Sequence, residues 1–160
     1  MGTAYLHAHL SDQAIELYRK LLEMDRGFAD GYRNLSLAYA GKGQYEEAIA
    51  IAQEGLKVAP DNPGMLSQLG YNYARADQRG EAQKTLTQLL VLAKQQDVSG
   101  AWIATLYAGL GDQEQAFAWL EKAYEVRSGN LVFLKAVPRY DSLRADPRFA
   151  DLVRRVGLPE

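Results

Sequence analysis

The chain has 160 residues, of which 48% are hydrophobic and 24% charged, a composition typical of an ordered protein. It contains no cysteine, so disulfide frameworks, thiolate zinc sites and thiol nucleophiles are excluded. The formal net charge of −2 argues against nucleic-acid binding, because neutralising phosphates requires a basic face. No apolar run approaches the roughly 20 residues that cross a bilayer, and no secretion signal follows Met1. We therefore expect a cytoplasmic protein without direct nucleic-acid or membrane contacts.

A repeat with a period of 34 residues runs through most of the chain. Its clearest column is formed by Tyr5, Tyr39, Tyr73 and Tyr107. A second column, nine residues later, is formed by Ala14, Ala48, Ala82 and Ala116. Because the chain has only ten tyrosines, such an alignment is improbable by chance. Small residues in the columns, such as Gly70, allow close helix packing, and each tyrosine ring is expected to wedge between two hairpins with its hydroxyl in polar surroundings.

Apolar residues at helical spacing, separated by turn residues, predict eight helices in the repeats. In chain order we expect them at residues 1–8, 11–24, 29–41, 44–58, 63–75, 79–95, 98–110 and 113–126. Gly43 and Gly111 fall in turns, and Asp112 is followed at helical spacing by Gln115, as in a capping box. Lys94 occupies the position of Pro60 one period later, which predicts that the helix at 79–95 continues for part of another turn.

The 34-residue pattern fades after Gly129. A short apolar stretch at 131–136 is followed by Asp146 and Pro147, which are suited to the N-cap and first turn of a helix. We predict a final helix that ends at Gly157. Its apolar stripe comprises Phe149, Leu152, Val153 and Val156. Together with Leu134 and Leu143, this stripe is expected to cover the apolar face of the last hairpin, because an open end of a stacked array exposes hydrophobic surface.

The repeat columns resemble the tetratricopeptide signature. The third repeat carries it most fully, in Leu66, Leu69, Gly70, Tyr73, Ala82, Leu86 and Leu89. The resemblance implies an all-α fold, a right-handed superhelical solenoid of helix-turn-helix hairpins with a C-terminal capping helix. It divides the chain into an array over residues 1–130, with a partial repeat at 1–28 and repeats at 29–62, 63–96 and 97–130, and a helical cap at 131–160.

The last sixty residues or so resemble the C-terminal ends of large bacterial multidomain regulators. The similar segments are Tyr107–Gly111, Ala116–Tyr124 and Asp141–Phe149. In such proteins tetratricopeptide arrays follow a serine/threonine kinase, a winged-helix DNA-binding domain or a nucleotide cyclase domain. The resemblance implies a regulatory or scaffolding interaction module. The first repeat begins in mid-helix, which suggests a fragment of a longer protein or an end covered by self-association.

The concave surface, lined by the first helix of each repeat, usually binds the ligand in this family. Transferring the groove positions gives Arg33, Asn34, Leu37, Ser67, Gln68, Tyr71, Arg75, Ala101, Trp102 and Thr105. Arg33 and Arg75 are suited to a carboxylate or to backbone carbonyls, and Tyr71 and Trp102 are aromatic contacts of the kind that dominate binding energy. Trp102 has an alternative role as a core residue that fills the space left by Gly100.

Other candidate sites are weaker. The clamp by which some relatives grip two carboxylates of chaperone tails needs lysine and asparagine where this chain has Leu37 and Gln68, so we do not expect chaperone-tail binding. His7 and His9, the only histidines, are two residues apart and point to different faces of a helix, so no metal site is expected. We predict no catalytic residue and no cofactor.

The sequence thus predicts a non-enzymatic module that binds a protein or peptide through its concave groove. The alternative is a structural self-association unit, in which a homodimer forms through the incomplete N-terminal repeat.

Overall fold

The computed structural model describes residues 2–158, and the side chains of residues 11–158. Over this range the chain is built from helices, without strands. The α-helices are α1 (Gly2–Met24), α2 (Ala29–Gly41), α3 (Tyr45–Val58), α4 (Pro63–Arg75), α5 (Arg79–Leu92), α6 (Gly100–Leu110), α7 (Gln113–Glu125) and α8 (Pro147–Val156). Two 3₁₀ helices, η1 (Gly129–Phe133) and η2 (Pro138–Leu143), lie between α7 and α8. The prediction of an all-α solenoid of hairpins with a capping helix is confirmed.

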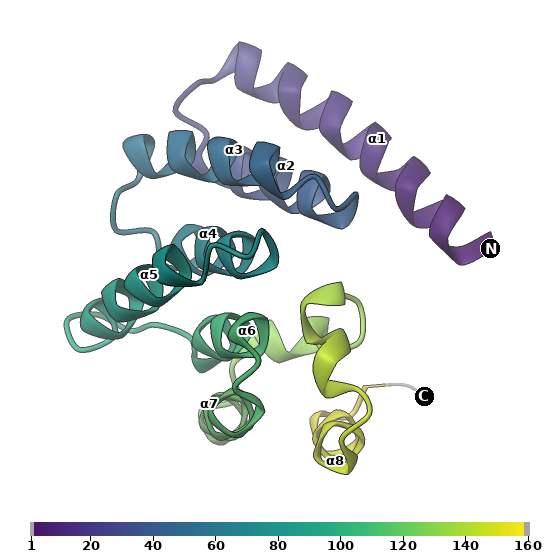
Figure 1. Cartoon of the computed structure of the whole chain (residues 1–160), viewed down its shortest axis with the longest axis vertical. Helices are drawn as coiled ribbons and strands as arrows, with labels where there is room; N and C mark the ends of the chain where they lie inside the picture. Colours follow the sequence, from purple (N-terminus) through teal and green to yellow (C-terminus); the bar gives the residue numbers. More distant parts are fainter. Residues whose placement is uncertain (1, 159–160) are drawn as a thin grey trace.

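The hairpins are α2 with α3, α4 with α5, and α6 with α7, and successive hairpins stack so that α2, α4 and α6 form one layer (Figure 1). The small residues of the repeat explain how closely the helices approach. Ala48, Ala82 and Ala116 have no exposed surface. At Gly70, an added Cβ atom would lie 2.6 Å from Leu106 Cδ1, which is closer than van der Waals contact allows. The close packing of α4 on α6 therefore depends on this small residue.

In the two repeats where the hydrogen bonds of the tyrosine are described, the tyrosine has the predicted placement, with a buried ring and a hydroxyl in polar surroundings. Tyr39 and Tyr73 are buried. The hydroxyl of Tyr39 accepts a hydrogen bond from Arg19, and that of Tyr73 accepts one from Gln53 Nε2 at 2.8 Å. Both donors stand twenty residues before their tyrosine, on the helix that precedes the tyrosine's own. The column therefore joins adjacent repeats.

The first predicted turn is absent, because α1 runs without a break from Gly2 to Met24. In the other repeats the chain turns at Gly43, Asp77 and Gly111, one period apart, with φ angles of 74°, 61° and 83°. His9 stands in this column in the first repeat. Glycine and, less often, aspartate adopt the left-handed conformation at low cost, whereas histidine continues a helix more readily. The prediction of separate helices at 1–8 and 11–24 is wrong for this reason.

The predicted extension of the helix at 79–95 is also wrong, because α5 ends at Leu92. The amide of Lys94 bonds to Val91 O at 3.1 Å and that of Gln95 to Leu92 O at 2.9 Å, so the last turn tightens and the helix stops. Leu92 is buried against α6 residues such as Ile103. The chain must turn back after Leu92 so that α6 can pack on α4. This packing, and not a proline, therefore determines where α5 ends.

The C-terminal part covers the last hairpin. Leu134, Leu143, Phe149 and Leu152 are buried in one cluster with Phe117 and Leu120 of α7. Asp146 caps α8 by accepting a hydrogen bond from the Arg148 amide at 2.9 Å, and the helix stops at Gly157, whose φ is 80°. In Figure 1 α8 lies beside α7, and the segment with η1 and η2 lies beside α6. None of the described helices is long and apolar enough to cross a membrane.

Candidate ligand-binding groove

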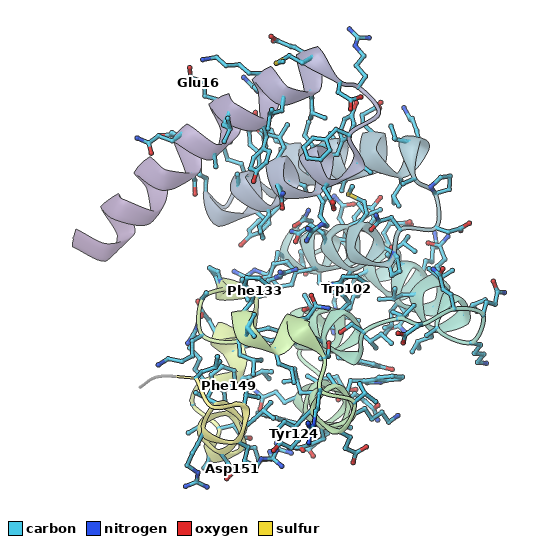
Figure 2. All side chains as sticks on the ribbon, turned by 180° about the vertical axis from the view of Figure 1, so that it is seen from behind. Glu16, Trp102, Tyr124, Phe133, Phe149 and Asp151 are labelled. Carbon is cyan, nitrogen blue, oxygen red and sulfur yellow. The ribbon has the colours of Figure 1, made fainter. Side chains whose placement is uncertain are left out.

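Helices α2 and α6 and the C-terminal segment enclose a cavity of about 230 Å³ on the concave side of the array. From the repeats it is lined by Arg33, Asn34, Leu37, Ala101, Trp102 and Thr105. From the C-terminal segment it is lined by Asn130, Phe133, Val137, Arg139 and Tyr140. All the groove positions transferred to the second and fourth repeats thus meet at one place. Trp102 and Phe133 are labelled in Figure 2, and Phe133 is 54% exposed.

The groove positions of the third repeat are placed differently. Ser67 and Gln68 are buried, and Ser67 Oγ donates a hydrogen bond to Trp102 O at 2.8 Å, which ties α4 to α6. Tyr71, also buried, lines a neighbouring cavity of about 270 Å³ together with the exposed Arg75. Arg75 Nε donates to the Tyr45 hydroxyl at 3.2 Å, a bond that raises the pKa of Arg75. Burial raises the pKa of the Tyr71 hydroxyl.

Thr105 is buried beneath the C-terminal segment. Its Oγ1 lies 3.0 Å from Ala101 O and 3.1 Å from the Tyr140 hydroxyl, which itself donates to Ala101 O at 2.9 Å. Tyr140 thus occupies the stretch of α6 that the sequence assigned to the ligand. Of the predicted groove residues, Arg33, Asn34, Leu37, Arg75 and Trp102 keep exposed surface.

Trp102 combines features of both roles considered for it. Its Cζ2 atom would lie 3.3 Å from a Cβ atom at Gly64, so the ring packs on the start of α4. The same residue lines the cavity and remains partly exposed. The space at Gly100 is filled instead by the backbone of α7, because a Cβ atom there would lie 2.6 Å from Trp119 O.

Arg139 is the charged residue at the centre of the groove, where it borders three cavities. Its Nη1 donates to Gln68 Oε1 at 3.3 Å, whereas its Nε is buried without a hydrogen-bond partner in the described part of the chain. Burial lowers the pKa of Arg139, and the nearby charge of Arg33 lowers it further. An arginine keeps its proton in such surroundings, so the groove holds a poorly compensated positive charge.

The five lining residues of the C-terminal segment were not among the sequence-predicted groove residues. The stretch Pro138–Asp141 follows the end of the 34-residue period, so no repeat register assigns it to a face. An arginine and a tyrosine between two apolar stretches were the only signal available there.

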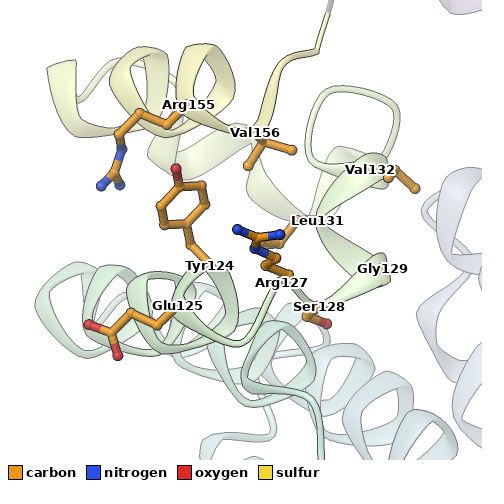
Figure 3. A pocket seen from close by; sticks show the side chains of 9 residues that line it. All are labelled: Tyr124, Glu125, Arg127, Ser128, Gly129, Leu131, Val132, Arg155 and Val156. Atoms are coloured by element: carbon orange, nitrogen blue, oxygen red, sulfur yellow. The ribbon is translucent and has the colours of Figure 1, made fainter.

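A larger cavity, about 640 Å³, lies between the end of α7, η1 and α8 (Figure 3). Arg155, which lines it, is paired with Glu121 and with Asp151 at 3.0 Å, and its guanidinium lies 4.6 Å from the ring centre of Tyr124. Because Arg155 is already paired with carboxylates of α7 and α8, it is less available to a ligand than Arg139 is.

His7 and His9, which were considered as metal ligands, lie outside the range of residues whose side chains are described. Within residues 11–158, no group of three or more histidine, aspartate or glutamate side chains is arranged to hold a metal ion.

The comparisons with known proteins agree with the fold of helical hairpins described above. Tetratricopeptide-repeat family profiles match residues 5–66 and 101–130. Among solved structures, the chain is similar to a thermophilic tetratricopeptide-repeat protein of Thermus thermophilus, with 26% identity over 93% of this chain and 76% of that one and a TM-score of 0.61. It shares its fold with MamA, with 17% identity over 91% of this chain and 86% of that one and a TM-score of 0.52. No curated protein sequence matches it significantly. The chain is therefore built of tetratricopeptide repeats, arranged as a solenoid of helical hairpins.

Proposed function

We propose that this chain is a module that binds a protein or peptide in the concave groove between α2, α6 and the C-terminal segment. Tetratricopeptide arrays generally mediate protein–protein interactions through such concave surfaces. The observation that supports the proposal most is the cavity where six groove positions of two repeats meet. Partly exposed aromatic side chains and arginines at its edge are the residue types enriched in binding hot spots.

The proposal includes the context of the module. We propose that it is a non-catalytic, regulatory or scaffolding part of a larger cytoplasmic bacterial protein. Its support is the resemblance of the C-terminal sixty residues to bacterial regulators and the similarity to a Thermus protein. The net charge of −2 supports a protein ligand rather than a nucleic acid.

The proposal is tested by affinity capture from a bacterial extract with the full chain and two variants. Leu37→Glu places a charge in the groove wall, whereas Val91→Glu places the same charge on an apolar residue of α5 that is 48% exposed. We expect the native chain and Val91→Glu to retain the same proteins and Leu37→Glu to lose them. Retention of the same proteins by Leu37→Glu, with its helical spectrum intact, would contradict binding in the groove.

Self-association is a second candidate, favoured by the outer face of α1. No residue of α1 from Ser11 onward is fully buried, and Leu17 and Met24 are 54% and 84% exposed. As the alternative to groove binding, we propose that the exposed apolar side chains of α1, Leu17 and Met24, form the interface of a homodimer. Sedimentation at several concentrations should then show a dimer that the double variant Leu17→Glu, Met24→Glu converts to monomer. A native chain that stays monomeric at high concentration would reject this candidate.

A further inference from the structure

The groove contains a guanidinium that lacks a counter-ion. No carboxylate of the described residues lies within ion-pair distance of Arg139, although other arginines of the C-terminal segment, such as Arg144 and Arg148, are paired. Within the described part of the chain, its side chain has a single hydrogen bond, the 3.3 Å contact with Gln68. The side chain of Arg139 is partly exposed, but its Nε atom is buried without a hydrogen-bond partner among the described residues, and a buried polar atom without a partner calls for an explanation.

The acceptor of this guanidinium, the side chain of Gln68, is held by a buried chain of hydrogen bonds. Gln68 Nε2 donates to Asn72 Oδ1 at 2.9 Å, Asn72 Nδ2 donates to Ser36 Oγ at 2.9 Å, and Ser36 Oγ donates to Ala48 O at 2.8 Å. Gln68, Asn72 and Ser36 are almost completely buried. The network therefore fixes the orientation of the Gln68 amide, whose oxygen is the acceptor for Arg139.

The cavity beside Arg139 supplies a second cation and a polar amide. Arg33 and Asn34 of α2 line it, and among the described residues Arg33 has one ion pair, a 3.4 Å contact with the exposed carboxylate of Asp30. The nearest charge of η2, Asp141, is engaged by Arg144 at 2.6 Å. At about 230 Å³, the space is below the roughly 300–1,000 Å³ typical of sites for drug-sized molecules and fits a single side chain or chain end.

We propose that the cavity between α2, α6 and η2 is a carboxylate-binding subsite in which Arg139 and Arg33 hold the anion and Trp102 and Phe133 contact an adjoining apolar group. Guanidinium forks match carboxylates in two parallel hydrogen bonds, so a carboxylate supplies the acceptor that Arg139 lacks. Reaching the enclosed Nε requires a small movement of the side chains around it. This inference rests on the proposed groove binding and names the ligand chemistry.

The direct test is a titration of the full chain, followed by the NMR resonance of the Arg139 Nε–H group. The probes are phenylacetate and its neutral isostere phenylacetamide, which share the aromatic ring and differ in charge. We expect phenylacetate to shift the Arg139 resonance saturably and phenylacetamide to leave it unchanged. Equal effects of both probes, or no saturable shift with phenylacetate, would overturn the proposal, and so would tighter binding of inorganic phosphate than of phenylacetate.

Matched variants assign the effect to the two arginines. Arg139→Gln and Arg33→Gln are expected to weaken phenylacetate binding at least tenfold, whereas Arg127→Gln, which makes the same charge change on the far side of the cap, should leave it unchanged. Because Arg33 lies on the surface of α2, its replacement keeps the test valid even if the Arg139 variant folds poorly. Unchanged affinity in the folded Arg33 variant would refute the role of that residue and the two-arginine site.

Two peptides distinguish the sources of the carboxylate. One carries an internal glutamate and a C-terminal amide, and the other carries glutamine and a free C-terminal carboxylate, with leucine neighbours in both. Preference for the first identifies an acidic side chain, and preference for the second a chain end. If Leu37→Glu abolishes protein capture but no carboxylate probe binds, only this inference fails. If the probe binds at Arg139 but the groove variant captures the same proteins as the native chain, the proposed function fails.

Discussion

Three glycines of the repeats provide a graded test of how closely the hairpins pack. A Cβ atom at Gly100 would lie 2.6 Å from the backbone oxygen of Trp119, and one at Gly70 would lie 2.6–2.8 Å from the side chain of Leu106. A Cβ atom at Gly80 would have no neighbour within 4 Å. Backbone cannot move aside as a leucine methyl group can, so the cost of an added methyl should fall in the order Gly100, Gly70, Gly80.

The magnitudes follow from overpacking and helix propensity. Overpacking costs typically about 1–3 kcal/mol, and replacing glycine by alanine within a helix returns up to about 1 kcal/mol. We therefore expect Gly100→Ala to lose about 2 kcal/mol of unfolding free energy and Gly80→Ala to gain about 0.5 kcal/mol. For a chain of this size, 1 kcal/mol corresponds to a shift of roughly 2–4 °C in Tm.

Urea unfolding monitored by circular dichroism measures all three variants. Trp102 and Trp119 belong to adjacent helices of the last hairpin, so tryptophan fluorescence reports on the same region. If Gly100→Ala is as stable as the native chain, or if Gly80→Ala is equally destabilised, then the close approach of α6 and α7 is not what requires glycine at position 100.

Three further outcomes are expected. Tyr73→Ala should lower the free energy of unfolding by about 3 kcal/mol or more, because it leaves a cavity between hairpins. In the same urea assay, replacing the exposed Glu47 by alanine should change it by no more than about 0.5 kcal/mol. Comparable losses from both variants would contradict the repeat register. Removal of residues 131–160 should lower Tm, cause aggregation in light scattering and abolish groove binding, and a stable, monomeric truncation that still binds its ligand would be inconsistent with the cap and the cavity described above. Hydrogen bonding to Arg148 lowers the pKa of Glu114 and that of Asp146, so these pairs stabilise the fold above the ordinary carboxylate pKa, and the benefit is lost as pH falls through the lowered pKa values. Arg148→Gln should therefore reduce Tm more at pH 7 than in acid, and an equal reduction in both conditions would argue against these ion pairs.

The 34-residue columns sufficed to predict the three hairpins from α2 to α7, because the turn and packing columns have similar local surroundings in these repeats. Gly43 and Gly111 mark turns that need the left-handed conformation, and the tyrosines join successive hairpins wherever their hydrogen bonds are described. The final helix was also predictable, since Asp146, Pro147 and Gly157 are local start and stop signals.

The two errors in the helices arose where the column and the local chemistry disagree. His9 occupies a turn column but has no preference for the left-handed conformation, so α1 continues through it. Lys94 lacks the constraint of proline, yet α5 stops before it because α6 must pack back on α4. In the first case local backbone preference prevailed over the repeat, and in the second tertiary packing prevailed over local preference.

For the candidate site, the resemblance to tetratricopeptide repeats indicated which positions of α2 and α6 to assign to the groove, and these positions line one cavity. What covers those positions was decided only by the tertiary structure. Arg139 meets Gln68 across 71 residues of chain, and Tyr140 meets Ala101 across 39. Neither separation is a multiple of the repeat, so no column predicts them. These contacts arise because the C-terminal segment must bury Leu131, Leu134 and Leu143 against the last hairpin, and doing so brings Arg139 and Tyr140 into the groove.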